Sequence, residues 1–64
     1  MNEERLENFE KMLCAVQWEY EETVVRMEEQ KEKGRVKSAT YRQLMGRKMT
    51  LQSILSLYEL YDLI

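Results

Sequence analysis

The sequence lacks the residues that interrupt helices and those that build many catalytic and metal sites. It has no proline and only two glycines in 64 residues, a composition that favours long uninterrupted helices. It has no histidine, which excludes Cys/His zinc sites and histidine-based acid–base chemistry. Its one cysteine, Cys14, has no partner for a disulfide within the chain. We therefore expect no catalytic residue, no metal site and no cofactor.

The chain is also short, and nothing covalent compensates for its length. A chain of 64 residues forms one domain at most, and domains of this size bury only about 60% of their unfolded surface. With 44% hydrophobic and 34% charged residues the composition is that of a folded chain, not a disordered one. Without a disulfide or a metal, we expect a second copy of the chain to supply the missing stabilisation.

No stretch approaches the roughly 18 continuous apolar residues that a membrane span requires. The acidic N-terminal segment also lacks the basic and apolar regions of a signal peptide. Together with the free cysteine, these features predict a cytoplasmic protein with no membrane partner.

A heptad pattern predicts a first helix over about residues 3–33. Its apolar positions recur at alternating steps of three and four, which places them on one face. They are Leu6, Phe9, Leu13, Val16, Tyr20, Thr23, Met27 and Gln30. Gly34 is the expected left-handed residue after the helix, and a turn over 34–38 leads to Ser38 or Thr40, either of which can cap a second helix.

The second helix is predicted over about residues 39–63, and its last part organises the chain. The three-and-four seam continues along it, with one polar interruption at Arg47, through Leu44, Arg47, Leu51, Ile54, Tyr58 and Tyr61. The stretch Leu51–Ile64 is apolar around most of its circumference, so it must be buried on most sides. A short connection makes the two helices antiparallel neighbours. Gly46 is a site of close helix approach, a tolerated weak spot, or a break after which Thr50 caps a third short helix. Of these we expect a continuous helix.

These patterns predict an all-α fold, a single helical hairpin that dimerises into an antiparallel four-helix bundle. We expect the oligomer interface to include residues from both helices. They are Leu13, Val16, Tyr20, Leu51, Ile54, Leu55, Tyr58 and Tyr61.

Charge is separated along the chain. The charged residues in 1–30 are mainly acidic, whereas those in 31–48 are all basic apart from Glu32. One interpretation is self-complementarity. Within the chain, the hairpin would place Arg42 beside Glu28 and Glu29, and Arg47 and Lys48 beside Glu22. Between chains, an antiparallel dimer would place each basic turn near its partner's acidic N-terminus. The other is a nucleic-acid patch of Lys33, Arg35, Lys37 and Arg42, but the whole chain is acidic, with a pI of about 5.1, so we expect any such binding to be weak and salt-sensitive.

The predicted outer face of the first helix carries a short apolar stripe of Cys14, Trp18 and Val25. Either the core of the oligomer reaches round to it, or it is a patch for a further protein partner with Trp18 as the anchor. Cys14 has no histidine to activate it, so it is interpreted as a small apolar residue and not as a nucleophile.

No stretch carries a motif of a known family. The sequence predicts a small non-catalytic, homo-oligomeric interaction module, a regulator or adaptor that acts through protein–protein contacts. The alternative is a nucleic-acid-binding regulator that uses the basic turn and the start of the second helix.

Overall fold

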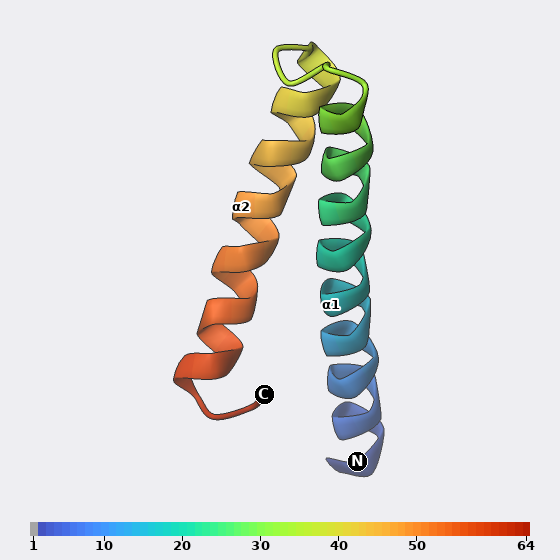
Figure 1. Cartoon of the computed structure of the whole chain (residues 1–64). Coiled ribbons are helices and arrows are strands. Elements are labelled where there is room, and N and C mark those ends of the chain that lie inside the picture. The colour runs from blue at the N-terminus through green and yellow to red at the C-terminus, as the bar shows by residue number, and fades with distance from the viewer. Residues whose placement is uncertain (1) are drawn as a thin grey trace.

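The computed structural model describes residues 2–64, which form two antiparallel α-helices joined by a short turn (Figure 1). Helix α1 spans Asn2–Glu32 and helix α2 spans Ala39–Leu60. The hairpin is elongated, with principal dimensions of 49 × 19 × 15 Å. The predicted all-α hairpin is therefore observed, and residues 2–64 contain no strand.

The turn is built by one glycine and one serine. Gly34 takes a left-handed backbone with φ of 70°, and the amides of Gly34 and Arg35 donate to the carbonyls of Lys31 (3.0 Å) and Gln30 (2.8 Å). These two bonds satisfy two of the carbonyls in the last turn of α1. The Ser38 hydroxyl then accepts from the Tyr41 amide at 3.1 Å, which caps α2. The role predicted for Gly34 is confirmed, and Ser38 is the cap of α2.

Helix α2 ends at Leu60, earlier than the predicted end near residue 63. Asp62 has φ of 56°, and the amides of Asp62 and Leu63 donate to the carbonyls of Glu59 (3.0 Å) and Tyr58 (2.8 Å). This repeats the arrangement at the end of α1, with an aspartate where α1 has Gly34. Aspartate tolerates the left-handed region better than most residues, so it ends the helix although the apolar pattern continues to Ile64.

Helix α2 passes through Gly46 without a break. A Cβ added at Gly46 would meet no atom within 4 Å, so the two helices of one chain do not approach closely there. The Thr50 hydroxyl donates to the Gly46 carbonyl at 3.1 Å, as a residue inside a helix does. The prediction of one continuous helix is confirmed, and Thr50 does not cap a third one.

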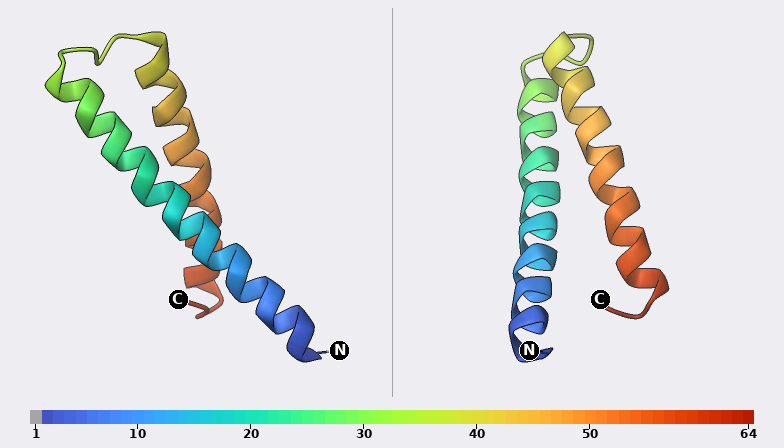
Figure 2. Two further views of the ribbon diagram at one scale, coloured as in Figure 1. Left: turned by 90° about the vertical axis from the view of Figure 1, so that its right-hand side faces the viewer. Right: turned by 180° about the vertical axis from the view of Figure 1, so that it is seen from behind.

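The core is a single thin layer between the helices. Its buried side chains all lie on the predicted seams: Leu13, Thr23, Met27, Leu51 and Tyr58. Leu51 is the most deeply buried, with 2% of its surface exposed. Figure 1 and the rear view in Figure 2 show the helices separating towards their free ends, where the rings of Phe9 and Tyr58 meet edge to face at 5.4 Å. One hairpin therefore leaves many of its apolar side chains uncovered.

Candidate interaction surfaces

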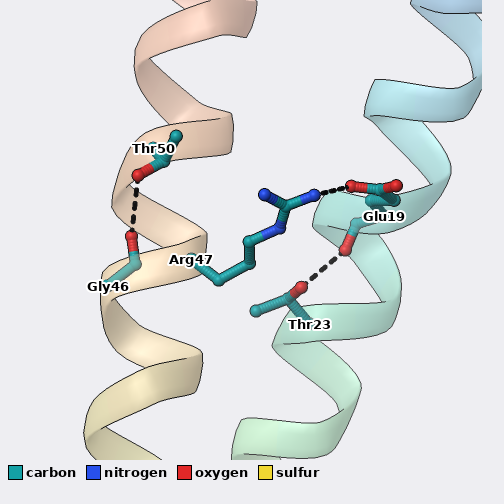
Figure 3. A network of polar contacts seen from close by, with 5 residues as sticks. All are labelled: Glu19, Thr23, Gly46, Arg47 and Thr50. Carbon is teal, nitrogen blue, oxygen red and sulfur yellow. Dashed lines mark hydrogen bonds and ion pairs between the residues drawn. The ribbon is translucent and has the colours of Figure 1, made fainter.

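An ion pair joins the two helices near their middle (Figure 3). The Arg47 guanidinium reaches from α2 to the Glu19 carboxylate of α1. Glu22, the predicted partner of Arg47, instead pairs with Arg26 one turn further along α1, at 3.5 Å. The predicted pairing was wrong by one turn of α1, because the seam pattern does not fix the relative height of two helices that separate along their length.

Thr23 lies beside this pair and is the only polar side chain in the buried layer of residues 2–64. Its hydroxyl donates to the Glu19 carbonyl at 2.7 Å, so no hydrogen-bonding atom of its side chain is left unpaired. Bonding to its own helix lets a polar residue occupy the seam without a partner on α2.

A shallow open groove of about 230 Å³ runs along this side of the hairpin. It is lined by Trp18, Glu19, Glu22, Thr23, Arg26, Leu44 and Arg47. Its two carboxylates are already matched by its two guanidiniums. Its walls contain no pair of side chains arranged as a nucleophile and a base, and residues 2–64 contain no group of three or more side chains placed to hold a metal ion.

The predicted oligomer-interface residues divide into three groups in the structure. Leu13, Leu51 and Tyr58 are buried inside the hairpin itself, so they form the contact between the two helices of one chain. Tyr61 lies after the end of α2 and is exposed. The remaining four are half-buried: Val16, Tyr20, Ile54 and Leu55. Tyr20 and Leu55 also line a second shallow groove of about 210 Å³ with Gln52, Ser56 and Glu59.

The stripe of Cys14, Trp18 and Val25 is exposed along α1. The Trp18 side chain is 63% exposed, although it also borders the groove beside Glu19. Helical spacing puts the three residues on one side of α1, away from the buried Leu13 and Met27. Within residues 2–64 all three side chains of this stripe remain exposed.

A further apolar surface, which the sequence analysis did not single out, lies on the outer side of α2. Met45, Met49, Leu57 and Leu60 are all exposed there. A signal was present in the sequence, because Gly46, Met49, Ser53, Ser56 and Leu60 repeat the three-and-four spacing of a second heptad seam. We call this surface, with Met45 and Leu57 at its margins, the outer face of α2.

The basic turn does not find partners within the hairpin. The side chains of Lys33, Arg35, Lys37 and Arg42 are exposed, and none forms an ion pair within residues 2–64. The predicted contacts of Arg42 with Glu28 and Glu29, and of Lys48 with Glu22, are therefore not formed. Among residues 2–64, the ion pair that joins the two helices is that of Arg47 with Glu19, and Arg26 pairs with Glu22 inside α1.

Neither described helix is both long and apolar enough to cross a membrane. Comparisons with protein-family models, with curated proteins and with solved structures found no match to this chain. Its surfaces are therefore the basis for any proposal about its function.

Proposed function

We propose that this chain is a small non-catalytic interaction module that works as a homodimer, in which two hairpins form a four-helix bundle. In this role it is a regulator or adaptor that acts through protein–protein contacts. The proposal includes a cytoplasmic location, which the single exposed thiol of Cys14 supports, since such thiols persist in reducing compartments.

The observation that carries the proposal is the balance of buried and exposed apolar side chains. Within residues 2–64, four hydrophobic side chains are buried, whereas twelve large ones are exposed. Scattered exposed apolar residues are normal, but here several gather along one side of α2. A layer as thin as this one gives a 64-residue hairpin little stability, and a second hairpin would cover what the first leaves exposed.

Sedimentation equilibrium at micromolar concentration tests the dimer. We expect a mass about twice the 7.8 kDa of one chain. Leu55→Asp should dissociate and unfold the protein together, because the new charge would lose water in the assembly without gaining a partner. Gln43→Asp, which places the same charge on an exposed position of α2, is the matched control and should remain dimeric. A wild-type chain that unfolds cooperatively as a monomer would refute the proposal.

We further propose that the stripe of Cys14, Trp18 and Val25 is the surface offered to another protein. Tryptophan is among the residues that most often dominate interface energetics, and here it is exposed with small apolar neighbours. Affinity capture from the source cell should recover a partner with the wild-type chain and lose it with Trp18→Ala. The control Met12→Ala changes another exposed apolar residue of α1 outside the stripe, and it should retain the partner.

The second candidate is a nucleic-acid-binding regulator, and the unpaired basic turn favours it. Lys33, Arg35, Lys37 and Arg42 have no acidic partner within the described hairpin, so they are available to phosphates. The net charge of −2 opposes this role. Sub-micromolar binding of RNA or DNA at roughly physiological salt, lost on replacing Arg35 and Lys37, would favour this candidate over the first.

A further inference from the structure

Helix α2 presents an apolar seam on one side and a face of small and apolar residues on the opposite side. The inner seam, with Leu51 and Tyr58, packs on α1. The outer face continues through Gly46, Met49, Ser53, Ser56 and Leu60, and every one of these residues is exposed. Figure 2 shows that α1 covers only one side of α2, so the outer face has no partner in the hairpin.

Three hydroxyls on this side of α2 are already hydrogen-bonded to their own helix. The hydroxyls of Thr50, Ser53 and Ser56 donate to the carbonyls of Gly46, Met49 and Gln52, at 3.1, 3.0 and 2.9 Å. Burying a hydroxyl that keeps its hydrogen bond costs far less than burying an unpaired one. The outer face therefore behaves as a surface of small and apolar groups, which allows close approach of another helix.

We propose that the outer face of α2 packs against the same face of a second copy, with the two α2 helices antiparallel and Ser53 on the two-fold axis. This inference rests on the proposed homodimer but gives it another arrangement than a bundle. Because the outer face lies on the side of α2 opposite α1, the four helices would lie in a row, with the two α2 helices in the middle. The residues buried at the dimer contact are then not Leu13, Leu51 and Tyr58, which α1 and α2 already use within one chain.

The sizes of the facing side chains fit an antiparallel pair of α2 helices centred on Ser53. In an antiparallel pair centred on Ser53, positions equally distant from it on either side lie opposite each other. Gly46 then faces Leu60 of the second copy, and Met49 faces Leu57. A residue without a side chain is thus opposite a leucine, while serine meets serine at the centre, where the two backbones come closest. Alternating large and small residues across a helix contact is how such surfaces interdigitate.

The charges of α2 favour a second copy of the chain as the partner of the outer face, and they favour an antiparallel orientation of that copy. Apart from Arg47, which already pairs with Glu19 of α1, the first half of α2 carries Arg42 and Lys48 and no acid. The second half carries Glu59 and no base, with Asp62 just beyond. A second copy running antiparallel places each basic half beside an acidic half, and a parallel copy would place like charges together. Each exposed pair contributes only about 0–1 kcal/mol, but their common sign sets the orientation.

The test is a disulfide across the axis. Helix axes in contact lie about 8–10 Å apart and each Cα lies about 2.3 Å from its axis, so two Ser53 Cα atoms on the two-fold would be roughly 5 Å apart. That separation is within the range of a disulfide. In a Cys14→Ser background, Ser53→Cys should crosslink rapidly and almost completely on oxidation with diamide, and circular dichroism should show unchanged helix content because Ser53 is exposed.

Two controls fix the register. Gly46→Cys alone should not crosslink, because the two copies of this position would be about 20 Å apart along antiparallel helices. A mixture of Gly46→Cys and Leu60→Cys chains should form the mixed disulfide in preference to either self-disulfide. Rapid self-crosslinking of Gly46→Cys would show parallel helices and overturn the inference.

Sedimentation of the uncrosslinked Ser53→Cys chain separates this inference from the proposed dimer. A chain that is dimeric but does not crosslink at Ser53 would overturn the outer-face contact and leave the homodimer standing. A monomer at micromolar concentration would overturn both, and would leave the outer face of α2 to a different protein.

Discussion

Replacing Leu51 with alanine is the sharpest test of the contact between the two helices. Leu51 is 2% exposed and lies in the middle of α2, so the substitution removes most of a side chain from the centre of the buried layer. A buried leucine replaced by alanine loses its transfer free energy and leaves a cavity, at a cost of about 2–5 kcal/mol. We take about 3 kcal/mol, since the open sides of so thin a layer allow partial collapse.

This loss is large for so short a chain. At roughly 0.05–0.15 kcal/mol per residue, 64 residues give a total stability of about 3–10 kcal/mol. One kcal/mol shifts the melting temperature of a domain of this size by roughly 4–8 °C. Leu51→Ala should therefore lower Tm by about 12–24 °C, or prevent folding altogether.

Thermal unfolding followed by circular dichroism measures the effect. Every variant is compared at one protein concentration, because association changes apparent stability. Leu6→Ala is the matched control: it makes the same chemical change on α1 at a side chain that is 58% exposed, and it should cost less than about 1 kcal/mol. Equal losses for Leu51→Ala and Leu6→Ala would refute the packing of α2 on α1 through Leu51.

Two further predictions concern the helix ends and the ion pair. Gly34→Ala should lower the free energy of unfolding by about 1 kcal/mol, because a φ of 70° disfavours a side chain. Asp62→Gly should raise it by up to about 1 kcal/mol, because glycine adopts the φ of 56° at the end of α2 more readily. Thermal unfolding that moved either Tm in the other direction would contradict this. A double-mutant cycle with Glu19→Gln and Arg47→Gln should give a coupling energy below about 1 kcal/mol that falls with added salt. The reason is that the two side chains are 43% and 54% exposed. A coupling energy above about 2 kcal/mol would show a stronger pair than this exposure allows.

The sequence was sufficient to predict the two helices and the side chains that are buried where they pack together. The three-and-four spacing selected Leu13, Met27, Leu51 and Tyr58, because a helical period of 3.6 places those positions on one side whatever lies opposite. Gly34 was equally predictable, since few other residues adopt the backbone that ends α1.

Most of the features that the sequence did not reveal depend on the position of one helix relative to the other. Spacing within α1 says nothing about its height relative to α2, so Arg47 was assigned to Glu22 and not to Glu19. The end of α2 was missed for a different reason: apolar residues continue past Leu60, and a local backbone preference at Asp62 outweighs them. The outer face of α2 was visible as a second seam, but only the structure shows that α1 leaves it exposed.

The unequal lengths of the helices predict a gradient of amide hydrogen exchange along α1. Helix α1 has 31 residues and α2 has 22, and Figure 1 shows α1 extending beyond α2 at the N-terminal end. The first turns of α1 have little of α2 to pack on, so their amides open by fraying at a free-energy cost near zero. Amides around Leu13 and Thr23 are held by the buried layer and exchange only when the whole hairpin unfolds. In the free hairpin, exchange should therefore slow progressively from Glu3 towards Leu13.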